Sequence, residues 1–84
     1  MITAAQLRAG RALLGIDQRQ LAELSGISLP TIQRMEATEG NVQGVIDSLT
    51  KVVEALNRAG IELIGENVES RAGGRGVRFA RPKQ

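Results

Sequence analysis

The sequence contains no cysteine, histidine, tyrosine or tryptophan, and Phe79 is its only aromatic residue. Without cysteine the chain can form neither disulfide bonds nor thiolate metal sites. Without histidine it lacks the commonest general base and metal ligand. The remaining carboxylates and lysines form no cluster suited to catalysis. We therefore expect a protein that is not an enzyme and that holds no metal and no cofactor.

Long apolar stretches are missing too. No run approaches the roughly 20 apolar residues that a membrane-spanning helix needs. The N-terminal sequence MITAAQLRAG has polar residues and an arginine where a signal peptide needs an apolar stretch. We expect a cytoplasmic protein with no membrane partner. The 84 residues suit one domain with a modest core and a tail.

Charge is unevenly distributed along the chain. The formal net charge is only +2, and residues 1–60 hold six Arg/Lys and six Asp/Glu. Residues 71–84 hold no acid but five cations, namely Arg71, Arg75, Arg78, Arg81 and Lys83. Such an end either binds nucleic acid, through extra phosphate contacts or as an arm in the minor groove, or is a solvated tail that keeps the protein soluble. Both interpretations remain open from the sequence.

Start and stop signals predict a first and a second helix. Thr3 and Asp17 are good N-caps, and each is followed three residues later by glutamine, the pattern of a capping box. Gly15 and Gly26 stand where these two helices must end, because glycine enters the left-handed region without a Cβ penalty.

A third helix follows, and its first residue is ambiguous. Ser28 is a good cap, but Pro30 favours extended geometry at Leu29, which makes Leu29 an alternative cap. Proline is harmless in the first turn of a helix. Ile32 and Met35, three residues apart, are expected to face the core.

A fourth helix is predicted after Glu39-Gly40, with Asn41 as its cap and an end near Ala59-Gly60. Its apolar residues recur at helical spacing and form a wide stripe. We expect this stripe to close the core and to leave apolar surface for a second subunit. The stripe comprises Val42, Val45, Ile46, Leu49, Val52, Val53 and Leu56.

Beyond Gly60 the apolar pattern changes period. Ile61, Leu63 and Ile64 suggest one short strand, and Val77 and Phe79 suggest another. An isolated hairpin is marginal in water, so these strands must dock on the helices or pair with a second chain. The expected fold is mainly α: a four-helix domain over 1–60, a strand and dimerisation segment over 61–80, and a flexible basic tail over 81–84.

The second and third helices flank Gly26 in the arrangement of a helix-turn-helix, whose second helix can enter a DNA major groove. The stretch resembles the Cro/phage-repressor type of helix-turn-helix, the Xre-like family of small bacterial regulators, over roughly residues 3–60. The resemblance implies a salt bridge between Arg11 and Glu36; two independent surface charges are the alternative. The matching residues are Arg11, Gln18, Leu21, Ala22, Gly26, Ile27, Thr31, Ile32, Met35 and Glu36.

The resemblance implies binding of double-stranded DNA. Arg34 can bond guanine and Gln33 adenine, whereas Leu29 and Pro30 offer only apolar contact, for example to a thymine methyl group. The alternative is a helical bundle in which Gln33 and Arg34 are simply solvated. The expected base contacts are Leu29, Pro30, Gln33, Arg34 and Ala37, and the expected phosphate contacts are Gln18, Arg19, Ser28 and Thr31. A homodimer interface is expected at Ile61, Leu63, Ile64, Val77 and Phe79.

These features predict a nucleoid-associated, sequence-specific transcription regulator. It is expected to repress as a homodimer on a near-palindromic operator. The alternative is an antitoxin-like protein that neutralises a partner toxin and represses its own operon, which adds a protein partner. A neighbouring toxin-like reading frame would favour this alternative.

Overall fold

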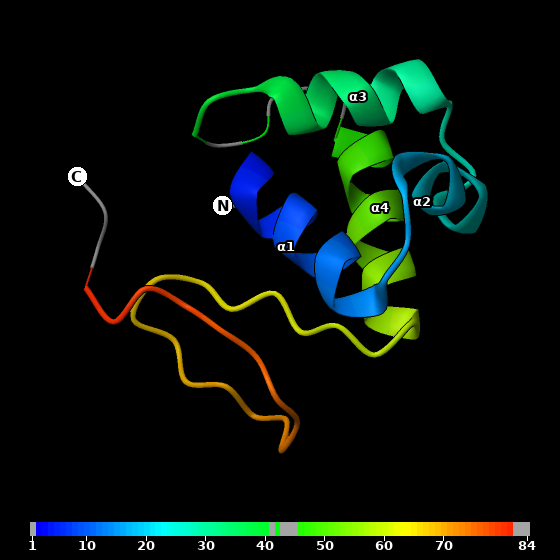
Figure 1. Cartoon of the computed structure of the whole chain (residues 1–84). Coiled ribbons are helices and arrows are strands. Elements are labelled where there is room, and N and C mark those ends of the chain that lie inside the picture. Colours follow the sequence, from blue (N-terminus) through cyan, green and yellow to red (C-terminus); the bar gives the residue numbers. More distant parts are fainter. Residues whose placement is uncertain (1, 41, 43–45, 82–84) are drawn as a thin grey trace.

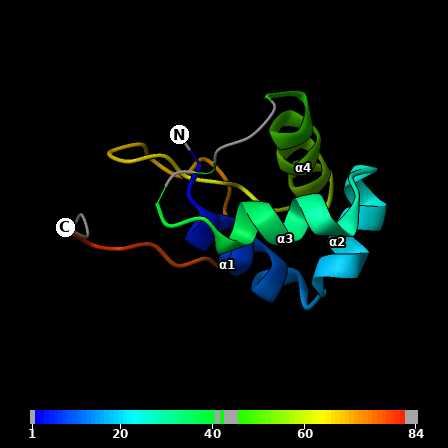
Figure 2. The ribbon, with the colours of Figure 1, turned by 90° about the horizontal axis from the view of Figure 1, so that it is seen from above.

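The computed structural model describes residues 2–40, 42 and 46–81, and these residues form four α-helices and no β-strand. Figure 1 shows α3 crossing one end of the molecule, with α1, α2 and α4 beneath it and the segment after α4 on the opposite side. Figure 2 looks down on α3 from above. The helices are α1 (Ala4–Leu14), α2 (Gln18–Ser25), α3 (Leu29–Ala37) and α4 (Ile46–Arg58).

The first three helices begin at the side chains that the sequence indicates. The capping boxes predicted at Thr3 and Asp17 are confirmed. The Asp17 carboxylate accepts from the Gln20 N–H at 2.8 Å, and the Asp17 N–H donates to the Gln20 side chain at 2.9 Å. Ser28, rather than Leu29, is the N-cap of α3, with Pro30 in the first turn. The prolyl ring therefore removes no helical hydrogen bond.

Three helices end in the same way, with a left-handed glycine followed by a half-buried isoleucine. After α4, Gly60 has φ 97° and the Ile61 N–H donates to the Leu56 carbonyl at 2.9 Å. The equivalent pairs are Gly15-Ile16 after α1 and Gly26-Ile27 after α2. Helix α3 lacks this ending, because its C-cap Thr38 is extended.

One core joins all four helices. Helix α2 packs against both α3 and α4, and α1 packs against α3. The small side chain of Ala22 is buried on α2, which allows a close approach of neighbouring helices. The largest fully buried side chains are Leu7, Leu21, Ile32, Val52 and Leu56. This core fixes α3 with one side inward and the other outward.

The predicted start of the fourth helix is wrong. Val42 is buried but not helical, and its N–H donates to the Ile2 carbonyl at 2.9 Å. Ile46, the first residue of α4, is 79% exposed instead of contributing to the core stripe. The connection after α3 pairs with the N-terminal segment, and this non-local contact decides where Val42 lies. The proposed cap Asn41 and the stripe residue Val45 lie outside the described residues.

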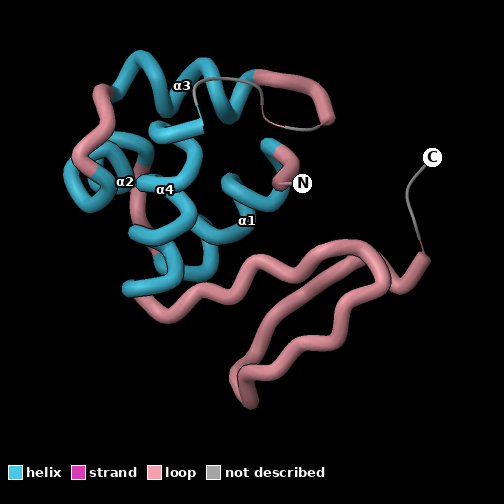
Figure 3. Tube along the Cα trace, turned by 180° about the vertical axis from the view of Figure 1, so that it is seen from behind, coloured by secondary structure: helices cyan, strands magenta, loops and turns pink. Residues whose placement is uncertain are grey.

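The predicted C-terminal hairpin is also wrong. Residues 61–81 contain no strand, as Figure 3 shows, and no backbone hydrogen bond joins 61–64 to 75–80 in this described segment. Ile61 and Leu63 instead pack against the helical core, and the Gln6 side-chain amide donates to the Ile64 carbonyl at 2.9 Å. Side chains, rather than a ladder of backbone hydrogen bonds, thus dock the segment on α1. Most of the expected tail, residues 82–84, lies outside the described residues.

Candidate nucleic-acid interface

Helix α3 has a buried and an exposed side. Ile32, Met35 and Glu36 are buried, whereas Gln33 and Arg34 are exposed. Pro30 and Ala37 are exposed as well, and Leu29 is half-buried against the core. The exposed side of α3 therefore includes the residues expected to contact bases, with Leu29 partly turned inward.

A buried carboxylate holds α3 against α1. The two oxygens of Glu36 accept from the Nε and Nη2 atoms of Arg11, each at 2.7 Å. The Glu36 side chain is 2% exposed and the Arg11 side chain 20%. The hydrogen bond to Glu36 raises the pKa of Arg11, and the negative charges of Glu36 and Asp17 add to this, against the opposing effect of burial. The pair is bidentate and largely shielded from water, so it is stronger and more directional than an exposed ion pair.

Glu36 also connects α3 to α2 and to a second arginine. The Gln18 side-chain amide donates to a Glu36 carboxylate oxygen at 3.2 Å, and Arg8 donates to the Glu36 backbone carbonyl. An amide nitrogen carries two hydrogens, so Gln18 keeps one N–H for another acceptor. Sequence reasoning missed the contact of Arg8. Its only signal was that Arg8 lies three residues before Arg11, on the same side of α1.

The C-terminal carbonyls of α3 are capped from outside the helix backbone. Arg8 of α1 binds the Glu36 carbonyl, and the Thr38 hydroxyl donates to the Arg34 carbonyl at 3.0 Å. At the C-terminal ends of α1, α2 and α4, a carbonyl of the helix instead accepts from the backbone N–H of the isoleucine that follows the glycine. The position of α3 therefore depends on α1 more than on its own C-terminal turn.

Three polar side chains form a line along the exposed side of α3. The Ser28 and Thr31 hydroxyl groups share a hydrogen bond at 2.9 Å, and Arg34 Nη2 donates to the Thr31 hydroxyl at 3.1 Å. The shared bond uses one of the two hydroxyl hydrogens, so the pair has one left to donate to a phosphate. Arg34 uses a single N–H on Thr31, which leaves enough donors for a paired contact to guanine.

The remaining expected contacts are Arg19, for a DNA phosphate, and the five residues of the expected dimer interface; they lie on α2 and in the segment after α4, respectively. Arg19, in the first turn of α2, is exposed. In the segment after α4, Ile61 and Leu63 pack on the core of the same chain, while Val77 and Phe79 are 81% and 69% exposed. Ile64 is half-buried. The structure therefore does not bring the five residues of the expected dimer interface together into one exposed surface.

In the part of the chain that the structure describes, no helix is long and apolar enough to cross a membrane. No group of three or more acidic side chains there is arranged to hold a metal ion.

Comparison with known families agrees with the arrangement of α2 and α3. A family model described as helix-turn-helix matches residues 7–43, from within α1 to the connection after α3. No curated protein and no solved structure matches the chain. The match supports the resemblance to Xre-like regulators and a DNA-binding role in transcription regulation.

Proposed function

We propose that this protein is a sequence-specific transcription regulator that places α3 in the major groove of DNA. One observation carries the proposal: the exposed side of α3 presents Gln33 and Arg34, while buried Glu36 fixes the opposite side to α1 and α2. A rigid helix with outward polar side chains can distinguish base edges without first becoming ordered.

The side chains on and beside α3 divide into two roles. Arg34 and Gln33 discriminate bases, with apolar contact from Pro30, Ala37 and the exposed part of Leu29. Arg19, the second N–H of Gln18 and the spare hydroxyl hydrogen of Ser28 and Thr31 bind phosphates. The N-terminal dipole of α2 favours a phosphate near Gln18 and Arg19.

The regulator acts as a homodimer on a near-palindromic operator, at which it represses by occupying the promoter. A single module of this size buries too little surface for tight specific binding, whereas a twofold dimer contacts two half-sites about one helical turn apart. The exposed side chains of Val77 and Phe79 support a dimer contact in the C-terminal segment.

A selection from duplexes randomised over 20 to 30 base pairs tests the proposal. It should enrich one sequence with twofold symmetry. Two arginines then serve as matched variants, because both are exposed and carry the same charge. Arg34→Ala should lose about 1–3 kcal/mol of discrimination at one base pair of each half-site. Arg19→Ala should weaken binding to selected and random duplexes alike.

Two outcomes would contradict parts of the proposal. Failure to enrich any sequence would exclude sequence-specific binding. Equal weakening by Arg34→Ala on every duplex would make Arg34 a phosphate contact. Sedimentation of the free protein tests the dimer separately: a protein that stays monomeric well above its DNA-binding concentration would exclude a preformed dimer.

A further inference from the structure

Arg34, on the outer side of α3, is held at two points by hydrogen bonds. Its backbone carbonyl accepts from the Thr38 hydroxyl at 3.0 Å, and its Nη2 atom donates to the Thr31 hydroxyl oxygen at 3.1 Å. The first contact holds the backbone at the end of the helix, and the second holds the guanidinium group. Because Arg34 is exposed, hydrogen bonds direct its guanidinium group more than packing does.

The Thr31 hydroxyl is in turn fixed by the N-cap of α3. The Ser28 hydroxyl shares a hydrogen bond with the Thr31 hydroxyl at 2.9 Å, and its oxygen also accepts from the Thr31 N–H at 3.4 Å. Thr31 is half-buried, and a β-branched side chain has few rotamers in a helix. The oxygen atom that receives Arg34 therefore has a defined position on the helix.

The charge of Arg34 favours one direction for the bond between the two hydroxyl groups. A hydroxyl oxygen that accepts from a cation becomes a better donor through its own hydrogen, because neighbouring hydrogen bonds polarise one another. The Thr31 oxygen accepts from Arg34, so the Thr31 hydroxyl donates to Ser28 rather than the reverse. The hydrogen that remains for a phosphate is then that of Ser28.

The contact with Thr31 prepares Arg34 for a base. A long side chain loses rotamer freedom when it binds, and prior orientation reduces this cost. The guanidinium group has five N–H donors in a planar fork, and Thr31 takes only one of them. A neighbouring pair of donors is left for the O6 and N7 atoms of guanine.

The neighbouring base contact lacks such support. Gln33 is exposed, and its side chain makes no hydrogen bond in the part of the chain that the structure describes. Thr31 therefore holds one of the two polar side chains that are expected to distinguish bases and leaves the other untouched. Gln33 thus provides an internal reference for any effect of Thr31.

We propose that Thr31 is a positioning residue for base selection, whose hydroxyl group holds the guanidinium group of Arg34 in the orientation that binds guanine. The inference rests on the proposed function, because it assumes that α3 faces DNA and that Arg34 contacts a base. Thr31 acts through Arg34 and contacts no base itself. This role is separate from the phosphate contact of the hydroxyl pair, which affects all sequences alike.

Two replacements of Thr31 test the proposal. Thr31→Val keeps the branched shape but removes the hydroxyl group, whereas Thr31→Ser keeps the hydroxyl group. Binding is measured to the selected duplex and to duplexes altered at the base pair that depends on Arg34 or on Gln33, which alanine variants of these two residues identify. A lost phosphate contact weakens all duplexes equally and cancels in the ratio of two affinities.

Thr31→Val should lower selectivity at one base pair only. The ratio of affinities at the base pair of Arg34 should fall roughly 2- to 10-fold, because only the cognate duplex requires Arg34 to become ordered. The ratio at the base pair of Gln33 should stay unchanged, and Thr31→Ser should keep both ratios. In an Arg34→Ala background Thr31→Val should change neither ratio, since its effect requires the guanidinium group.

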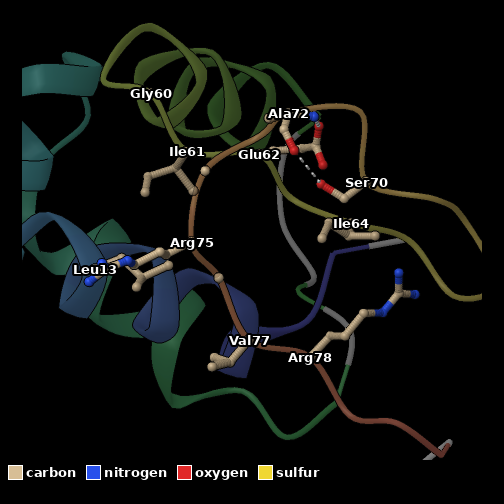
Figure 4. Close-up of a pocket in the computed structure, with 12 residues that line it drawn as sticks. Leu13, Gly60, Ile61, Glu62, Ile64, Ser70, Ala72, Arg75, Val77 and Arg78 are labelled. Carbon is tan, nitrogen blue, oxygen red and sulfur yellow. Dashed lines mark hydrogen bonds between the residues drawn. The ribbon is translucent and has the colours of Figure 1, made fainter.

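A remote arginine controls for the loss of exposed charge. Arg75 belongs to the segment after α4, on the side of the molecule opposite α3. With Leu13 of α1 it lines an open cavity of about 280 Å³, as Figure 4 shows. Arg75→Ala removes the same charge as Arg34→Ala without altering α3, and should leave both ratios at their wild-type values.

The outcomes separate the two proposals. Failure to select any sequence, or unchanged base selection in Arg34→Ala, would refute the proposed function. Selection through Arg34 with an unchanged or raised ratio in Thr31→Val would overturn only the role of Thr31. Equal losses at both base pairs, or a loss that Thr31→Ser shares, would also overturn it, because the cause would then be a shift of α3 and not the missing hydroxyl group.

Discussion

The helical part, described over residues 2–40, 42 and 46–58, buries most of its large apolar side chains, whereas the C-terminal segment, residues 61–81, packs only its first ones against the core. The large side chains Leu7, Leu21 and Leu56 of the helical part are buried in one core. In the segment, Val77 and Phe79 stay mostly exposed. An apolar pattern thus determined structure where a core could receive the side chains. Beyond Ile64, where the large apolar side chains Val68, Val77 and Phe79 are exposed, side-chain contacts to backbone groups determine the path.

Replacement of Glu36 should reduce the stability of the helical part more than the other substitutions considered below. Glu36→Ala removes the acceptor of Arg11 and Gln18 at a largely buried position, and should lower the free energy of unfolding by about 2–4 kcal/mol. Urea unfolding followed by circular dichroism measures this loss. Glu39→Ala is the matched control, because Glu39 is exposed, and should change stability by less than about 0.5 kcal/mol. Similar stability of the two variants would contradict the role assigned to Glu36.

The junction between the two regions should be the next most sensitive position. Ile61 is half-buried and packs against the core, so Ile61→Ala should cost about 1–2 kcal/mol, less than at a fully buried site. Val77→Ala, at an exposed position of the C-terminal segment, should cost less than about 0.5 kcal/mol. Comparing the two unfolding midpoints tests whether the segment is docked only at its start. Equal losses would show that Val77 is buried in solution, for example in a dimer.

Gly10 allows the same junction to be strengthened. It is buried within α1, and an added Cβ would lie 3.5 Å from side-chain atoms of Ile61 and Leu56, an ordinary contact distance. Gly10→Ala should therefore stabilise the protein by about 0.5–1 kcal/mol through its helix preference. Gly26→Ala, at φ 70°, should destabilise it by about 1–2 kcal/mol. Thermal unfolding measures both effects. If Gly10→Ala lowers the stability, the side chains at the junction must pack more tightly than the distances of 3.5 Å indicate.

The smallest effect should be confined to the C-terminal segment. The Ser70 hydroxyl, followed by the N–H groups of Arg71 and Ala72, lowers the pKa of Glu62 below its ordinary value of 4.5. The contacts of the ionised carboxylate are thus complete above about pH 4.5 and are lost as the pH falls through the lowered value. Amide NMR signals of residues 71 and 72 should shift in this acidic window.

Glu62→Gln should produce similar shifts at neutral pH, and the control Glu66→Gln should leave the signals of residues 71 and 72 unchanged. The signals of α1 to α4 should report no change from Glu62→Gln. A measured pKa of Glu62 at or above 4.5 would contradict the assigned contacts.

Local signals in the sequence predicted much of the helical part. Thr3, Asp17 and Gly26 act on backbone groups within a few residues, so their effect can be derived from neighbouring residues alone. The position of Val42 could not be predicted in this way, because it depends on a hydrogen bond to Ile2. The alternating pattern after Gly60 suggested strands, but a strand needs a second backbone at the right distance, which no sequence pattern guarantees.

The candidate interface shows the same contrast between features that neighbouring residues determine and features that depend on distant contacts. Which residues of α3 face outward followed from the spacing of Ile32 and Met35, since the opposite side of a helix must then be exposed. The spacing of Arg8 and Arg11 places both on the same side of α1, but it cannot show that Arg8 binds a carbonyl 28 residues away, because every residue carries a carbonyl group. Nor could the sequence show that Ser28 and Thr31 share one hydrogen bond.

The way α3 is held has a consequence for the evolution of specificity. Its fixed points are buried Ile32, Met35 and Glu36 and the contact from Arg8, and none of these involves the side chains of Gln33 or Arg34. Substitutions at Gln33 and Arg34 therefore leave the attachment of the helix intact. New binding preferences can then accumulate by single replacements on the outer side of α3, each nearly neutral for folding.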